Sequence, residues 1–154
     1  MKVGRLPFGV DTDFFYPASA GLINNNQISI GFPSDKNRKE KNYPLFEKIL
    51  QELSRKYIVT SFVFHNRTRN EVRGGLNNVD ILLMTSTSEG SPQIIKEAMA
   101  CNVPVVSTSV GDIETLLEGV NNCYLVDGFN FTNFIGPIEE FYVLIKKNVN
   151  QMEE

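Results

Sequence analysis

The fold is decided by the stretch DILLMTSTSEGSPQIIKEAMA, which occupies residues 80–100. Its first part, 80–84, is an apolar run with the length and composition of a buried strand. A short polar loop follows. A helix is then predicted over 91–102, because Ser91 suits the N-cap and Pro92 suits the first helical position, where its missing N–H costs nothing. The stretch therefore predicts a strand that leads through a loop of small residues into a capped helix.

The start of this helix is a predicted anion site. The backbone N–H groups of Gln93 and Ile94 have no acceptor inside the helix, and they point out of its positive end. Glu89 precedes the helix, and Glu97 lies about 7 Å along the axis from Pro92. A diphosphate at the helix end would place one carboxylate beside a sugar and the other beside a ribose. Taken alone, this spacing equally suits a solvated loop carboxylate and an exposed helix charge.

Strand-like and helix-like runs alternate along the rest of the chain. Strands are predicted at 27–32, 57–64, 80–85, 104–108 and 123–126. Helices are predicted at 43–56, from 68 to either 75 or 78, at 91–102, at 113–117 and from about 131 to 149, with a break at Gly136-Pro137 left open. This alternation indicates βαβ units, and therefore an α/β fold: an open parallel-sheet, Rossmann-like domain. Ligands of such folds bind at the carboxyl ends of the strands, where the 88–90 loop lies.

Composition excludes several classes of protein. A length of 154 residues suits one domain, and a net charge of −3 gives no broad basic face for nucleic acid. No apolar run approaches the length of a membrane span, and the N-terminus lacks a signal-peptide pattern, so we expect a cytoplasmic location. Cys101 and Cys123 lack a CxxC spacing and are predicted to be buried reduced thiols. With His65 as the only histidine, we expect no metal site.

The 80–111 region resembles the nucleotide-sugar-binding segment of family-4 retaining glycosyltransferases. The matching motifs are Ser-Glu-Gly-Ser-Pro at 88–92, Glu-Ala-Met-Ala at 97–100 and the strand and glycine loop VPVVSTSVG at 103–111. The resemblance runs from about Leu6 to Val126. It implies the C-terminal donor-binding domain of the two-domain GT-B fold.

The N-terminal segment resembles the crossing between the two domains of that family. The run LPFGVDTDFFYP at 6–17 carries the Gly-Val-Asp, Phe and Pro positions of this crossing. The resemblance implies that residues 1–25 are a hinge or linker and that 26–150 form the nucleotide-sugar-binding domain. The expected partner is an N-terminal acceptor-binding domain or a companion chain. A peripheral contact with a membrane, if the enzyme makes one, would lie in that missing domain.

The resemblance also assigns roles. It implies transfer of a sugar from a nucleoside diphosphate sugar, of UDP or GDP type, to a glycan or lipid-linked acceptor. The implied contacts are Glu89 to the sugar, Gly90, Ser91, Pro92, Gln93 and Ile94 to the phosphates, Lys41 to the diphosphate and Glu97 to the ribose hydroxyls. On these roles, removing Glu89 should spare binding of a bare nucleotide.

One departure from the family pattern concerns the first strand. The family carries a Gly-Arg dipeptide at its end, whereas Phe32 follows Gly31 here. Arg38, in the loop that follows, could supply the missing charge, so Lys41, Glu89 and Arg38 form the candidate catalytic group. No cofactor or metal is expected. The family's active-site histidine belongs to the first domain, and His65 does not inherit its role.

Two alternatives stay open beside the transferase. A truncated or split gene product could bind a nucleotide sugar or a partner chain and transfer nothing. A receiver or flavodoxin-like signalling domain shares the βαβ alternation. Receivers need aspartates at the strand ends, where Phe32-Pro33 and Thr85-Ser86 stand instead.

Overall fold

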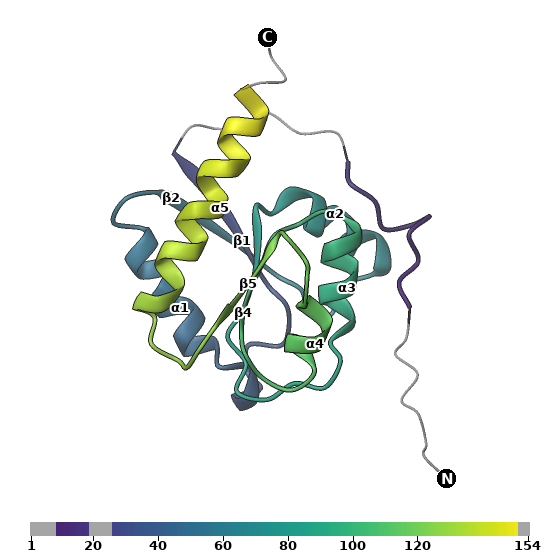
Figure 1. Ribbon diagram of the computed structural model, residues 1–154, viewed down its shortest axis with the longest axis horizontal. Helices are drawn as coiled ribbons and strands as arrows, with labels where there is room; N and C mark the ends of the chain where they lie inside the picture. The colour runs from purple at the N-terminus through teal and green to yellow at the C-terminus, as the bar shows by residue number, and fades with distance from the viewer. Residues whose placement is uncertain (1–8, 19–25, 151–154) are drawn as a thin grey trace.

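A computed structural model of the chain describes residues 9–18 and 26–150 (Figure 1). Its strands are β1 (Gln27–Phe32), β2 (Ile58–Val63), β3 (Ile81–Met84), β4 (Val105–Thr108) and β5 (Cys123–Val126). Its helices are α1 (Tyr43–Leu53), α2 (Arg69–Asn78), α3 (Gln93–Ala100), α4 (Ile113–Leu117) and α5 (Thr132–Asn150), with a short 3-10 helix, η1 (Lys39–Lys41), before α1. The predicted elements are all present. Much of the predicted hinge at 1–25 lies outside the described residues.

The five strands form one parallel sheet in the order β2-β1-β3-β4-β5. The chain leaves β1 for β2 on one side and then returns to β3 on the other side of β1. The connections after β1 and β3 therefore leave the sheet in opposite directions, and the carboxyl ends of these two strands form the switch point at which such folds bind ligands. The predicted open parallel-sheet, Rossmann-like fold is confirmed.

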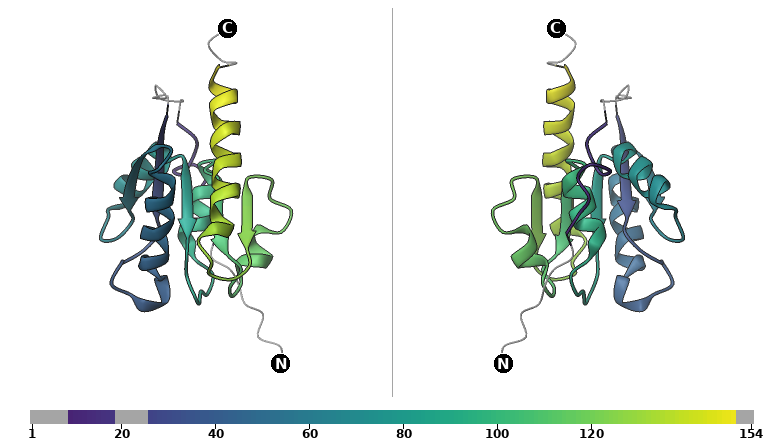
Figure 2. Two further views of the ribbon diagram at one scale, coloured as in Figure 1. Left: turned by 90° about the vertical axis from the view of Figure 1, so that its left-hand side faces the viewer. Right: turned by 90° about the vertical axis from the view of Figure 1, so that its right-hand side faces the viewer.

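Each face of the sheet carries its own hydrophobic core. On β3, Ile81 and Leu83 belong to the core beneath α1 and α5. Leu82 and Met84, on the same strand, belong to the opposite core, beneath α2, α3 and α4. Successive side chains of a strand point to opposite faces, so an unbroken apolar strand is what a sheet covered on both sides requires. Figures 1 and 2 show the helices in these two layers, with α5 extending beyond the sheet.

Two helices resolve alternatives that the sequence left open, an end of α2 near 75 or 78 and a break in α5 at Gly136-Pro137. An N-terminal capping box of α2 joins Thr68 and Glu71, and the helix continues through Gly74 and Gly75 to Asn78. The last helix, α5, is continuous through Pro137. Phe134 and Ile138, on either side of this proline, are fully buried in the α1–α5 core. Packing of these side chains offsets the hydrogen bond that proline cannot donate.

Both cysteines carry free thiols. Cys101 is buried and Cys123 is partly buried. Burial raises the pKa of both thiols, that of Cys123 to about 11. Over 9–18 and 26–150, no three or more histidine, cysteine, aspartate or glutamate side chains gather in a way that would hold a metal ion. Within the same residues, every helix is too short or too polar to cross a bilayer.

We expect Gly75→Ala to destabilise the protein although alanine is the better helix former. A Cβ at this position would lie 2.7 Å from the Phe62 ring and 2.8 Å from the Phe64 ring. The overlap should cost about 1–3 kcal/mol of unfolding free energy, more than the propensity gain returns. Gly74→Ala is the matched control, because a Cβ there meets open space. Urea denaturation should show the control gaining about 0.5–1 kcal/mol. Equal effects of the two substitutions would contradict this packing.

Candidate active site

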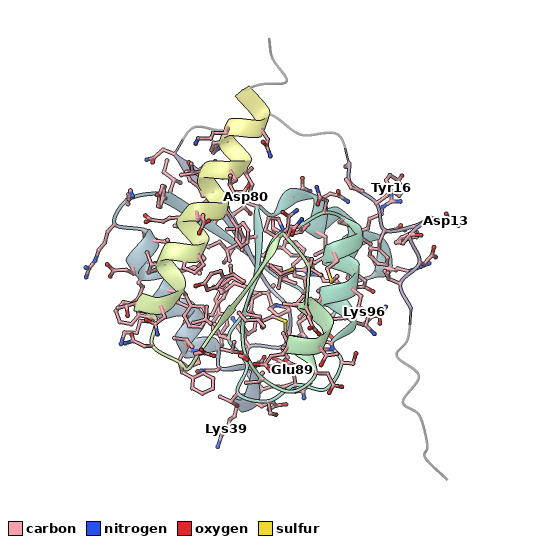
Figure 3. All side chains as sticks on the ribbon, in the orientation of Figure 1. Asp13, Tyr16, Lys39, Asp80, Glu89 and Lys96 are labelled. Atoms are coloured by element: carbon pink, nitrogen blue, oxygen red, sulfur yellow. The ribbon has the colours of Figure 1, made fainter. Side chains whose placement is uncertain are left out.

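The candidate site lies at the carboxyl ends of β1 and β3, where two charged side chains meet. The ammonium of Lys41, which follows β1, donates to Oε1 of Glu89, which follows β3, over 2.5 Å. Both side chains are largely enclosed, with exposed fractions of 12% and 6%. Figure 3 shows Glu89 and Lys39 toward one end of the sheet, and Asp80 toward the other. Two of the predicted site residues, far apart in sequence, thus form one ion pair.

Hydroxyl groups at the ends of β3 and β4 fix the position of Glu89. The Ser86 hydroxyl donates to Oε1 of Glu89 over 2.6 Å. The Thr108 hydroxyl, at the end of β4, donates to the carbonyl oxygen of Ser86 over 2.6 Å. Ser86 and Thr108 are both buried. Because buried hydroxyls need partners, these bonds fix the loop that carries the carboxylate.

The same strand end also holds the segment that carries Lys41. The buried Thr85 hydroxyl lies 3.0 Å from the carbonyl oxygens of both Lys41 and Asn42. The Thr87 backbone N–H donates to the Glu40 carbonyl over 2.8 Å. Asn42 has a positive φ of 52°, a conformation that asparagine tolerates better than most residues. The three residues after β3 therefore position both members of the ion pair.

Gly111, in the β4–α4 loop, lies against the backbone of Glu89. Its φ is +59°, and a Cβ added there would lie 2.0 Å from the Glu89 carbonyl oxygen. Only glycine combines this backbone conformation with so close an approach. The loop that carries Glu89 is therefore bounded by β4 on one side and by Gly111 on another.

The start of α3 differs from the prediction in one respect. Pro92, not Ser91, occupies the N-cap position, and no side chain caps the helix. Pro92 has an extended ψ of 120°, so the helix begins one residue later, at Gln93. The N–H groups of Gln93 and Ile94 still precede the first i to i−4 bond, so they keep the geometry of an anion site. The predicted Ser91 cap is wrong because Ser91 lies one residue outside the helix.

The Gln93 side chain bonds to the N-terminal segment, while the prediction concerned only its backbone N–H. Its Nε2 donates to the carbonyl oxygen of Gly9 over 3.0 Å. The segment 9–18, which contains Gly9, also packs on α2. There Arg69 donates to Asp11 over 2.5 Å, and its guanidinium lies 4.0 Å from the ring centroid of Phe14. The candidate phosphate-binding end of α3 is thereby tied to the N-terminal segment.

Glu97 lies half-buried on α3. Burial raises the pKa of its carboxyl group, while the positive charge of Arg69 acts in the opposite direction. Desolvation disfavours the ionised carboxylate, and hydroxyl donors from a ligand would favour it again. Glu97 is therefore suited to accept hydrogen bonds from a neutral polar ligand.

The remaining predicted residues are more exposed. Gly90 and Ser91 lie at the surface and Pro92 is partly covered. Arg38 pairs with Glu40, its Nε donating to Oε1 over 2.6 Å, and more than half of its side chain is exposed. His65 is also exposed and lies 3.8 Å from Asp35. The described contacts thus bring Lys41 and Glu89 together without Arg38.

Sequence reasoning missed the residues that support the pair, namely Thr85, Ser86, Thr108 and Gly111. A signal for the first two was present, because a polar Thr-Ser pair directly follows the apolar β3. Their partners lie on other elements, however, and the spacing along the chain does not identify those partners.

Comparisons of the sequence with a family model and with curated relatives point to the same family. The family model of glycosyl transferases group 1 matches residues 3–142. The D-inositol 3-phosphate glycosyltransferase of Paenarthrobacter aurescens is 31% identical over 72 residues, which are 47% of this chain and 18% of that relative. The corresponding enzyme of Arthrobacter is 32% identical over a stretch of the same length. The chain therefore matches only a minor part of these curated relatives.

Solved structures share the fold. The C-terminal domain of a glycosyl transferase group 1 family protein from Francisella tularensis has a TM-score of 0.63 and 20% identity, with 88% of each chain covered. A glycosyltransferase from Rickettsia africae has a TM-score of 0.68 and 16% identity, over 89% of this chain and 46% of that one. Anabaena HepE, solved with UDP and glucose, has a TM-score of 0.62 and 15% identity, over 86% and 45%.

We expect Gly111→Ala to destabilise the protein more than its backbone conformation alone explains. An alanine at positive φ costs about 1–2 kcal/mol. Gly119→Ala is the matched control, since Gly119 has a φ of +73° with nothing near its added Cβ. The overlap with the Glu89 carbonyl should add about 1–3 kcal/mol at Gly111 only. Urea denaturation of both variants measures the difference, and equal losses would exclude a packing role for Gly111.

Proposed function

The chain belongs to the glycosyl transferases group 1 family, and on that premise we propose that it binds the nucleoside diphosphate sugar that supplies the transferred sugar. The observation that carries the proposal is the meeting of Lys41 and Glu89 at the switch point between β1 and β3. Open parallel sheets bind their ligands at this point, beyond the carboxyl ends of the strands. UDP and glucose bound to Anabaena HepE, which has a similar fold, support a nucleotide-sugar ligand.

Each part of the proposed donor has a complementary group. Lys41 and the N–H groups at the start of α3, those of Gln93 and Ile94, would bind the diphosphate, with Gly90, Ser91 and Pro92 lining its path. Glu97 would accept the two ribose hydroxyls, since a carboxylate offers two acceptor oxygens. Glu89 would contact the sugar. Arg38 would add a second positive charge only after leaving Glu40.

The chemistry follows from these charges. When the bond from the sugar to the diphosphate breaks, negative charge builds up on the leaving phosphate. A lysine ammonium and a helix N-terminus that are already in place stabilise this charge more in the transition state than in the ground state. We therefore propose a transfer that needs no metal ion or cofactor, with a donor of UDP or GDP type.

Completing the reaction requires an acceptor held in attack geometry beside the donor. We propose that an N-terminal domain or companion chain binds this acceptor, a glycan or lipid-linked molecule. The segment 9–18, tied to α2 and α3, would then be the hinge that joins the two halves. A retaining outcome, which rests on the family resemblance, and a cytoplasmic location, which rests on the sequence pattern, belong to the same proposal.

We expect residues 1–154 by themselves to bind at least one of UDP, GDP and ADP, weakly, because in this proposal an N-terminal domain or companion chain completes the site. Ligand-observed NMR at about millimolar concentrations is the measurement, since half-built sites bind with low affinity. Lys41→Ala should weaken the binding of this nucleotide, whereas Lys48→Ala, a change on an exposed face of α1, should leave the binding unchanged. If none of the three nucleotides gives a signal, the proposed donor site is wrong.

We also expect binding of this nucleotide to depend on the ionisation of Glu97. Burial raises the pKa of Glu97 above its ordinary 4.5, so protonation on acidification sets in at a higher pH than for an exposed glutamate. At about pH 7.5, Glu97→Gln should weaken binding by about 1–3 kcal/mol. The gap between wild type and variant should narrow at about pH 4, near the ordinary pKa of a glutamate, because protonated Glu97 is also a neutral group. Calorimetric titration at both pH values measures this gap. A gap that stays constant would exclude Glu97 as the titrating acceptor, since phosphate protonation affects both proteins equally.

A further inference from the structure

We infer that Glu89 occupies the diphosphate subsite from within the protein, and that its exchange for a ligand makes the site prefer the intact sugar donor over the bare nucleoside diphosphate. The inference rests on the proposed function and adds a specificity role to it. It concerns the role of Glu89 when no donor is bound and again when the sugar has been transferred and the nucleotide remains.

The geometry of the ion pair leads to this inference. The Lys41 ammonium already has an anionic partner, the Glu89 carboxylate, at 2.5 Å. Both side chains are nearly enclosed, so water screens their attraction less than it would at an exposed pair. A diphosphate that binds Lys41 must therefore compete with a carboxylate of the same charge sign. Without a ligand, the Lys41 ammonium is therefore paired with a carboxylate of the protein itself.

The exchange has a cost that depends on the ligand. When a diphosphate takes Lys41, Glu89 loses its only described cationic partner and keeps the Ser86 hydroxyl. An enclosed carboxylate deprived of its cation is strongly unfavourable unless other donors replace it. A sugar attached to the diphosphate brings hydroxyl donors to this carboxylate, whereas a bare nucleoside diphosphate brings none. The site therefore favours the donor, and it favours release of the nucleotide once the sugar has been transferred.

This exchange changes the effect that a substitution of Glu89 should have on the binding of a bare nucleotide. The roles taken from the family resemblance predict that removing Glu89 leaves binding of a bare nucleotide unaffected. The ion pair predicts instead that neutralising Glu89 strengthens it, because the Lys41 charge becomes free for the diphosphate. Removing a contact residue from a site would then improve binding of one of its ligands.

The test compares Glu89→Gln with wild type in the full 154-residue chain. Calorimetry would measure the affinities for UDP, GDP and ADP and for UDP-glucose, GDP-mannose and ADP-glucose. Whichever bare nucleotide binds should bind the variant about three- to tenfold more tightly, the range expected of one partly screened ion pair. The corresponding sugar donor should gain less, so the preference for the donor should fall. Glu47→Gln, the same change of charge on the exposed face of α1, should alter neither affinity.

A double-mutant cycle with Lys41→Ala identifies the mechanism, since coupled residues give non-additive effects. In the Lys41→Ala background, Glu89→Gln should no longer tighten nucleotide binding. Glu89→Ala carries the same expectations and replaces Glu89→Gln if thermal denaturation shows that variant to be unfolded. Suppose that a nucleotide binds and that Lys41→Ala weakens its binding, but that neither Glu89 variant tightens its binding. The proposed exchange is then wrong, while the proposed donor site stands. If no nucleotide binds the wild type, the proposed function fails and the exchange fails with it.

Discussion

The candidate site depends on one constraint of the backbone, the return of the chain from β2 to the far side of β1. Because the sheet order is β2-β1-β3, the connections after β1 and β3 leave the sheet in opposite directions. The ends of these two strands are therefore not covered by a helix that joins them. Lys41 and Glu89, which occupy these two ends, can approach closely and remain largely shielded from water. An order in which β2 lay between β1 and β3 would have separated them by the width of a strand, about 4.8 Å.

The interior beneath the ion pair contains buried hydroxyl groups at this end of the sheet. Thr85, Ser86 and Thr108 are buried, yet each of their hydroxyls has a partner on a neighbouring segment. A buried polar group without a partner would cost stability, and a satisfied network favours one arrangement of the surrounding loops. These buried hydrogen bonds therefore fix the loops that carry Lys41 and Glu89, even though the loops lie near the surface. Such support matters because transfer chemistry depends on positioning.

The N-terminal segment adds a second kind of coupling. Its residues 9–18 contact α2 through an ion pair and through aromatic rings, and they contact the start of α3 through Gln93. A movement of this segment would therefore reach both the half-buried Glu97, through Arg69, and the start of α3. Under the function proposed above, this contact would link the position of a second domain to the geometry of the candidate site.

Much of the architecture was predictable from local signals. The apolar runs at 81–84 and 105–108, the Thr68 capping box and the alternation of strands and helices determine the elements and the fold class. The motif at 88–100 points to the carboxylates, because short-range patterns fix a loop, a helix start and the residues on them. The predicted helix start at Ser91 was wrong, and the break at Pro137 was left open, because the place of a proline in a helix depends on the backbone around it.

Only the tertiary structure decided which charges meet. Sequence placed Lys41, Arg38 and Glu89 near strand ends, but it could not distinguish a lysine enclosed with Glu89 from an arginine turned outward to Glu40. The approach of Gly111 to the Glu89 carbonyl, and the Thr85 bonds to the Lys41 segment, likewise join residues from different strands. Such contacts arise from the order of strands in the sheet, a long-range property with no fixed spacing along the chain. The sequence by itself therefore determined the chemistry available at the site, and the fold determined how those groups are paired.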